Sequence, residues 1–376
     1  MNYFSLRNKC IFCNSTNLKV YFDNDYTIPI ASYNIDIKNN NNINIPFNIL
    51  CCQDCLTFQT KYLGDLNEIY KNNHADGYGN IRSIMNDTFA ELIKKTIPDI
   101  SNILEIGAGS GILSLSIYNI LPNINYNIID PFYFGPIENR NIIYDYLENI
   151  NLNMINTNIV VMSHVFEHFY EPLNIIEKLY NSQNIEYICL NFPDLETYIK
   201  NKTYHVLNPE HTYYVENDFL KQVFLKYGFE TILEEKFKEH SIFLIFKRVS
   251  NINPDMIIKN KNSIEDIDNY YKNINDTVNK LNNTLSLYDN KINKYIWPCS
   301  MHTMYLFIFG LEPNYFKAIL DNSNNKLNKY LYGYNLLCES YNNLIDINDN
   351  SVIVLNGGCF NKELNLNKSS NILYLI

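Results

Sequence analysis

The middle of the chain alternates short apolar runs with amphipathic segments. Apolar runs of strand length occupy residues 103–106, 126–129, 159–163 and 187–192. Residues 85–97 have helical periodicity and place on one face Met85, Phe89, Leu92 and Ile93. Because strands that alternate with helices form parallel sheets covered on both faces, this region predicts a doubly wound α/β sheet. Two further apolar runs, 230–237 and 241–247, lie close together and predict a hairpin at its end.

A heptad pattern follows a predicted linker at residues 251–262. Its apolar positions recur at alternating spacings of three and four residues: Ile264, Ile267, Tyr271, Ile274, Val278, Leu281 and Leu285. This spacing predicts one long helix with an apolar seam. A bridging helix packed on its own chain is favoured over a coiled coil between two copies.

The last part of the chain returns to a strand–helix–strand pattern. Its strand candidates are Tyr295–Trp297, Phe316–Leu320 and Val352–Leu355, and they predict a second, smaller α/β domain. Residues 1–70 are read as irregular, with short strand-like runs. The predicted organisation is therefore an N-terminal module (1–70), a central domain (71–250), a linker with the bridging helix (251–292) and a C-terminal domain (293–376).

Composition indicates the cellular compartment and argues against two classes of partner, membranes and nucleic acids. The 376 residues are 46% hydrophobic, enough to bury sizeable cores, and no apolar run is long enough to cross a bilayer. The N-terminus lacks a secretory signal pattern, so a cytoplasmic protein without a membrane partner is expected. A net charge of −10 argues against broad contact with nucleic acid, which needs a basic face.

A glycine-rich segment, Leu104-Glu105-Ile106-Gly107-Ala108-Gly109-Ser110-Gly111, joins the first predicted strand to a helix at 112–121. Glycines let the backbone approach a ligand, and the helix start offers free amides. Glu105 suits an ammonium group, and Asp130, at the end of the next strand, suits two ribose hydroxyls. We therefore expect S-adenosylmethionine rather than a dinucleotide. The expected cofactor-binding residues are Glu105, Gly107, Ala108, Gly109, Gly111, Asp130 and His164.

Cysteines form two C-x2-C pairs, Cys10 with Cys13 and Cys52 with Cys55. Each pair fits a tight turn that points two thiolates at one metal, and two pairs complete a tetrahedral zinc site. Four sulfurs leave no open position, so the expected zinc is structural. Cys51 leaves the register open by one residue, and Cys52 is chosen because it restores the x2 spacing. The alternative is four buried thiols without metal.

Three blocks, in this order, resemble the nucleotide-sugar C-methyltransferase family. They are the cysteine pairs with the segment 50–59 (LCCQDCLTFQ), the E-x-G-x-G-x-G loop at 105–111, and the segment 318–333 (AILDNSNNKLNKYLYG). The resemblance implies a Rossmann-like class I methyltransferase sheet between a small zinc module and a C-terminal α/β domain. It also implies methylation at carbon C3 of a nucleotide-linked 4-keto-6-deoxy sugar in deoxysugar biosynthesis.

The segment 208–214 (NPEHTYY) is similar to the family's Y-H-E-H-x-x-Y-F. The resemblance implies that His211 is the general base and that Glu210 orients it or shares its proton. It also implies substrate contacts from Tyr213 and Tyr214, and from Tyr78 ahead of the first long helix. On the residues alone, a surface helix cap is the favoured interpretation of Glu210 and His211, and the resemblance reverses that preference.

The chain departs from this family at three places. Asn208 stands where the family has tyrosine, His240-Ser241 lacks the following glycines, and Pro298–Thr303 replaces a loop of small residues. An O-methyltransferase acting on a sugar or glycan precursor therefore remains an alternative, because an alcohol needs only a base. A non-catalytic, zinc-bearing binding module is the second alternative.

Overall fold

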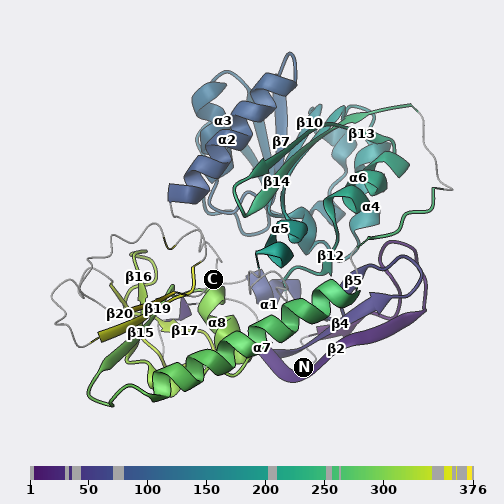
Figure 1. Cartoon of the computed structure of the whole chain (residues 1–376). Helices are drawn as coiled ribbons and strands as arrows, with labels where there is room; N and C mark the ends of the chain where they lie inside the picture. Colours follow the sequence, from purple (N-terminus) through teal and green to yellow (C-terminus); the bar gives the residue numbers. More distant parts are fainter. Residues whose placement is uncertain are drawn as a thin grey trace.

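The structure is a computed structural model that describes residues 4–29, 34–35, 44–70, 80–201, 210–250, 256–261, 264–340, 351–357, 361 and 371–374. A large twisted sheet lies at one end of the molecule, and two smaller sheets lie at the other, with the long helix α7 (Ile264–Ser286) running across them (Figure 1). Within the described ranges, none of the helices combines the length and apolarity needed to cross a bilayer.

The large sheet has seven strands. They are β7 (Asn102–Ile106), β8 (Asn125–Ile129), β9 (Arg140–Ile143), β10 (Ile159–Ser163), β11 (Tyr187–Pro193), β13 (Phe229–Phe237) and β14 (Ser241–Arg248). Their spatial order is β13-β14-β11-β10-β7-β8-β9, with only β13 and β14 antiparallel to their neighbours. The chain winds outward in both directions from β7 and β10, which makes their boundary the topological switch point. The predicted Rossmann-like fold is confirmed.

Helices cover both faces of this sheet. On one face lie α2 (Asn80–Thr96) and α3 (Ile112–Ile120), and on the other lie α4 (Pro172–Asn181) and α6 (Asn217–Lys226). In α2 the predicted face, which includes Met85, Phe89 and Ile93, is buried against the sheet. The helix begins at Asn80, earlier than the predicted 85–97, and Ile81, four residues before Met85, extends the same apolar face.

The N-terminal module is more regular than predicted. It contains β2 (Leu18–Pro29), β4 (Asn44–Cys52) and β5 (Phe58–Thr60), which form one antiparallel sheet with β12 (Tyr213–Tyr214). Register shifts along the pairing of β2 with β4 break the alternation of apolar and polar residues, so the sequence there resembled a loop. The smaller strands are β1 (Phe4–Leu6), β3 (Asn34–Ile35) and β6 (Tyr62–Gly64), and the short helix α1 (Leu66–Tyr70) follows.

The C-terminal part contains a parallel sheet in the order β18-β16-β15-β19-β20. The elements are β15 (Asn293–Trp297), α8 (Met301–Ile308), β16 (Ala318–Asp321), β17 (Tyr330–Leu331), β18 (Cys338–Ser340), β19 (Ser351–Leu355) and β20 (Asn371–Tyr374). β17 pairs with β3 of the N-terminal module, so backbone hydrogen bonding joins that module to the C-terminal part.

Helix α7 packs its seam within the same chain. Its buried heptad residues are Ile267, Tyr271, Ile274, Val278, Leu281 and Leu285. They belong to one core cluster with Phe47 and Phe58 of the N-terminal module and with Ile296 and Leu306 of the C-terminal part. A helix whose seam is already buried has no apolar stripe left for a coiled coil with a second copy. The helix therefore bridges the two smaller sheets.

Candidate functional site

A cavity of about 930 Å³ lies at the carboxyl ends of the parallel strands of the large sheet. Its walls come from the loop after β7, from the residues that follow β10, and from Trp297–Pro298 and Asp321–Lys326 of the C-terminal part. Ligands of doubly wound sheets bind at this place, outside the strand ends at the switch point. All five of the described histidines line this cavity: His164, His168, His211, His240 and His302.

The glycine loop forms the floor of the cavity beside β7. Gly107, Gly109 and Gly111 have φ values of +68°, +54° and +74°, a region that disfavours other residues. A Cβ at Gly107 would lie 2.6 Å from a methyl group of Val165, and one at Gly111 would lie 2.6 Å from the Tyr133 hydroxyl. Gly107, Ala108 and Gly109 line the cavity, whereas Gly111 supports the turn behind it.

Replacing Gly109 by alanine is expected to weaken binding of S-adenosylhomocysteine ~10-fold. The added methyl group meets no protein atom within 4 Å, so it would occupy cavity space that the ligand needs. Gly310→Ala is the matched control. Gly310 also has a positive φ and no atom closer than 4.0 Å to an added Cβ, but it lies outside the cavity. Isothermal titration checks both variants, and equal losses in the two would contradict this placement of Gly109.

The two predicted acidic residues line the cavity on either side of the glycine loop. Glu105 is 2% exposed and accepts a hydrogen bond from the Tyr126 hydroxyl at 2.8 Å. Burial raises the pKa of Glu105 to about 7, and a nearby ammonium group would return it to the ionised form. Asp130 accepts the backbone N–H groups of Gly109 and Phe132, each at 2.7 Å. Carboxylate oxygens have further lone pairs, so Asp130 can still accept from ribose hydroxyls. The pair fits an adenosylmethionine.

His164 has both ring nitrogens engaged. Its Nδ1 lies 3.2 Å from Glu167 Oε1, and its Nε2 lies 3.0 Å from the Ser241 hydroxyl. Its backbone has φ +55°, a strained conformation that points the ring across the strand ends. Burial lowers its pKa well below 6.5, so the ring is neutral. His164 lines the cavity, with its nitrogens held by protein partners, and its contact with the cofactor stays a prediction.

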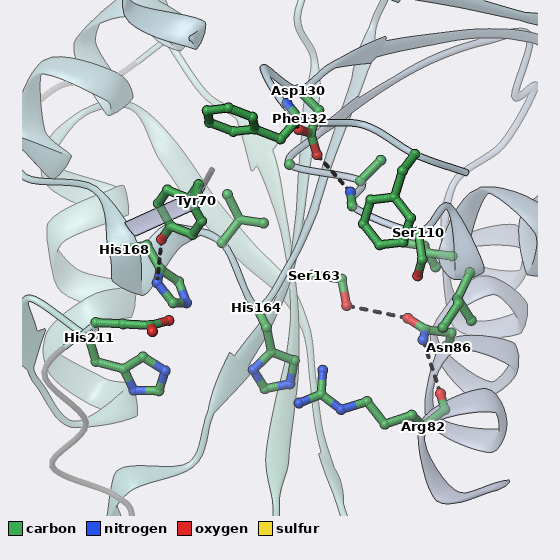
Figure 2. Close-up of a pocket in the computed structure, with 18 of the residues that line it drawn as sticks. Tyr70, Arg82, Asn86, Ser110, Asp130, Phe132, Ser163, His164, His168 and His211 are labelled. Carbon is green, nitrogen blue, oxygen red and sulfur yellow. Dashed lines mark hydrogen bonds between the residues drawn. The ribbon is translucent and has the colours of Figure 1, made fainter. Parts of the chain in front are cut away.

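His211 and His168 lie together on the wall opposite the glycine loop (Figure 2). Their rings are 5.0 Å apart and perpendicular, and His211 Nε2 lies 3.9 Å from Glu167 Oε1. The Tyr70 hydroxyl lies 3.0 Å from His168 Nδ1. Donor atoms of Glu167, His168 and His211 all lie within 4.8 Å of one another. This cluster can accept, hold and pass on a proton.

The electrostatics of the cluster keep it close to neutral. Burial, with the neighbouring histidines, lowers the pKa of His211 well below 6.5, so its ring has a free lone pair at neutral pH. Burial raises the pKa of Glu167 to about 7, and its Oε2 has no hydrogen-bond partner among the described residues. Glu210 lines the cavity beside His211. His168 lines the cavity, and Glu167, the preceding residue, is buried at 1% exposed.

The structure places Tyr213 and Tyr214, from which substrate contacts are expected, away from the cavity. Both side chains are buried, at 1% and 3% exposed, and neither lines the cavity. Tyr213 donates its hydroxyl to the carbonyl of Phe166 at 2.6 Å, and Tyr214 packs in the core beneath α7. Pairing of β12 with β5 fixes these directions, because successive side chains of a strand point to opposite faces. Tyr78 and Asn208 lie outside the described residues.

The backbone next to His211 is held by the N-terminal module. Thr212 donates its N–H to the Glu167 carbonyl, and its own carbonyl accepts the Thr60 N–H, each at 3.0 Å. The buried guanidinium of Arg7 donates to the Thr212 carbonyl and, at 2.8 Å, to the Tyr170 carbonyl. Burial lowers the pKa of Arg7 to about 10. Sequence reasoning missed Arg7, because no local pattern links it to a loop two hundred residues away.

The four predicted metal ligands converge in the N-terminal module. The sulfur atoms of Cys10, Cys13, Cys52 and Cys55 all lie within 4.8 Å of one another. Cys10 Sγ lies 3.4 Å from Cys55 Sγ, and Cys13 Sγ lies 3.5 Å from Cys52 Sγ. Cys51 is buried in the separate core beneath α7 and is not part of the cluster.

The two cysteine turns have the same backbone conformation. In each, the carbonyl of the first cysteine accepts the amide N–H of the fourth residue on, from Asn14 to Cys10 at 2.9 Å and from Leu56 to Cys52 at 3.0 Å. Asn14 and Leu56 have φ values of +60° and +61°. Equivalent turns that aim four sulfurs at one point fit a tetrahedral zinc ion, and a structural one, because no position remains open.

Comparison with known proteins identifies the central region. Residues 79–234 match the family model described as a methyltransferase domain. That match, with the strand order of the sheet and the glycine loop, makes this region an S-adenosylmethionine-dependent methyltransferase domain. No curated protein sequence matches the chain.

Solved structures resemble about half of the chain. The N-terminal domain of EvdMO1 with SAH bound shares 13% identity over 44% of this chain and 81% of its own, with a TM-score of 0.32. The plantazolicin methyltransferase BpumL shares 13% over 46% and 86%, with a TM-score of 0.38. The 1,6-didemethyltoxoflavin-N1-methyltransferase of Burkholderia thailandensis shares 7% over 46% and 82%, with a TM-score of 0.37. With TM-scores this low, these structures do not identify the methyl acceptor of this chain.

Proposed function

We propose that this methyltransferase acts on carbon C3 of a nucleotide-linked 4-keto-6-deoxy sugar. The observation that carries the proposal is the neutral His211, which faces the glycine loop across a cavity large enough for a cofactor and a sugar nucleotide. The sequence resemblance to the sugar C-methyltransferases, in its three ordered blocks, supports the same substrate class.

Different residues of the cavity would abstract the proton, stabilise the enolate and bind the cofactor in such a reaction. The C4 ketone makes the C3 proton acidic, and His211 takes that proton while the electron pair of the C–H bond moves into an enolate. Tyr70, whose pKa burial raises well above 10, stays protonated and, with His168, can donate toward the enolate oxygen. The bound cofactor supplies the electrophilic methyl group. Glu105, Asp130 and the glycine loop would hold this cofactor in the cavity beside the acceptor.

O-methylation of a sugar hydroxyl is the second candidate. It is favoured by the same observation, because His211 could equally take a hydroxyl proton, and by the chain's departures at 240–241 and 298–303 from the C-methyltransferase pattern. The two candidates differ in whether a carbon–hydrogen bond breaks.

Proton exchange tests that difference without methyl transfer. In D2O, with S-adenosylhomocysteine bound, the protein is expected to exchange the C3 proton of a nucleotide-linked 4-keto-6-deoxy sugar for deuterium, and His211→Ala is not. Proton NMR of the sugar follows the loss of the C3 signal. An O-methyltransferase leaves this proton in place, so the absence of exchange with bound sugar would contradict C-methylation.

The pH profile of kcat/KM reports the state of the base. Because the pKa of His211 is lowered well below 6.5, the base stays deprotonated on acidification, and activity is expected to persist to pH 6.5 and fall only below it. The Glu167 carboxyl has a pKa raised to about 7, so the same profile is measured for Glu167→Gln. Comparing the two profiles separates titration of Glu167 from titration of His211. If the acid limb of the wild type lay above pH 7 and vanished in Glu167→Gln, His211 would not be the titrating base.

A further inference from the structure

Arg82 stands apart from the other described arginines. The guanidinium groups of Arg7, Arg140 and Arg248 all donate hydrogen bonds to protein oxygens. In the part of the chain that the structure describes, the guanidinium of Arg82 has neither a hydrogen bond nor an ion pair. Only its backbone carbonyl is engaged, by the Asn86 side chain at 3.0 Å. A cation that is always charged therefore lacks a partner here.

The side chain of Arg82 reaches into the cavity. It leaves α2, runs across the cavity wall and ends beside the ring of His164 (Figure 2). The residue is half-buried, so its charge is only partly solvated. Holding a guanidinium away from bulk water without a counter-charge costs free energy, and such arrangements gather at binding sites.

The groups around Arg82 do not neutralise it. His164 and His240 are neutral, because burial lowers the pKa of each well below 6.5. The carboxyl of Glu167 has a pKa raised by burial to about 7, so it is partly protonated at neutral pH. Among the described residues, none of these groups forms an ion pair with Arg82, although the chain as a whole carries a charge of −10.

The charge of Arg82 acts at the acceptor end of the cavity. After burial and nearby groups, it contributes to the lowered pKa of His211 and to that of His302 in the C-terminal part. The pKa of Glu105, at the amino-acid end of the cofactor site, responds to Asp130 and Arg140 instead. An anion bound at Arg82 would lie next to His164, where the guanidinium ends (Figure 2).

We propose that Arg82 forms a subsite for an anionic oxygen group, carboxylate or phosphate, on the methyl acceptor. The planar fork of a guanidinium matches both groups with paired hydrogen bonds. The subsite rests on the proposed function only in that a methyl acceptor fills this part of the cavity. An anion there also raises the pKa of His211, which makes the ring a stronger base once the acceptor is bound.

Isothermal titration with inorganic pyrophosphate and, separately, with S-adenosylhomocysteine tests the proposal. Arg82→Met is expected to weaken pyrophosphate binding ~10-fold or more and to leave the affinity for S-adenosylhomocysteine within about twofold. Arg82→Lys keeps the charge without the fork and is expected to fall between. Lys95→Met is the control, because Lys95 is an exposed cation near the end of the same helix and outside the cavity.

The other outcomes are equally decisive. A loss of S-adenosylhomocysteine affinity with pyrophosphate binding unchanged would mean that Arg82 binds the carboxylate of the cofactor, and would overturn the subsite. Unchanged affinities for both ligands, or the same loss in Lys95→Met, would overturn it as well. The titrations need no turnover, so a failed transfer assay beside an Arg82-dependent pyrophosphate affinity would contradict the proposed acceptor and leave the anion subsite standing.

Discussion

Replacing His211 by alanine is expected to lower kcat for methyl transfer by ~10²–10⁴-fold, the usual contribution of a general base. Affinity for S-adenosylhomocysteine should not change, because Glu105, Asp130 and the glycine loop belong to β7, β8 and the loop after β7, away from the His211 segment. Figure 2 shows Asp130 and Ser110 apart from His211. The measurements are single-turnover rates with saturating acceptor, together with isothermal titration of the cofactor product.

Added imidazole separates a lost base from a lost shape. His211 is 18% exposed to the cavity, so a small imidazole can occupy the space that alanine leaves. Partial recovery of the rate, increasing with pH as the free imidazole loses its proton, is expected for His211→Ala. Glu210→Gln, which keeps the ring of His211, is expected to lose less activity. A His211→Ala variant that turns over at the wild-type rate would place the base elsewhere.

Replacing Cys52 by serine is expected to reduce bound zinc from about one equivalent per chain to a small fraction and to destabilise the N-terminal module. A serine hydroxyl is a poor zinc ligand, and the three remaining thiols cannot close a tetrahedron. Methyl transfer should fall as well, because β4, β5 and β12 share one sheet and β12 directly follows the His211 loop. Elemental analysis and a thermal unfolding curve give the first two results.

Cys51→Ala is the matched control for this variant. Cys51 is the preceding residue on the same strand, equally buried, but its side chain enters the core beneath α7 and not the sulfur cluster. Its substitution is expected to cost ~1–2 kcal/mol of packing and to leave the zinc content at about one equivalent. Full metal occupancy in Cys52→Ser, or loss of metal in Cys51→Ala, would contradict the assigned ligands.

Features that depend on local backbone conformation could be predicted from the sequence. The glycine spacing of 107–111 requires positive φ at fixed positions, and the x2 spacing of the cysteines requires a tight turn. The strand–helix alternation likewise gave the sheet, because each element has its own periodicity. The structure then brings the four cysteines together and places Glu105 and Asp130 in one cavity.

Features that depend on contacts between distant segments could not be predicted. Tyr213 and Tyr214 match a family motif, but the motif does not indicate that β12 pairs with β5. That pairing buries both rings in the protein core. Arg7 has no neighbour in sequence that indicates its contact with Thr212. Arg82 is one polar residue in an amphipathic helix, and only the folded cavity shows that its guanidinium lacks a partner among the described residues.

The most direct test of the central proposal uses S-adenosylmethionine with a carbon-13 methyl group, a panel of nucleotide-linked 4-keto-6-deoxy sugars, and NMR of the products. We expect a labelled methyl at an aliphatic carbon shift, attached to C3, and none with His211→Ala. A label at an ether shift would contradict carbon methylation while keeping the fold and the cofactor. No transfer to any sugar by protein that binds S-adenosylhomocysteine would contradict the proposed substrate class.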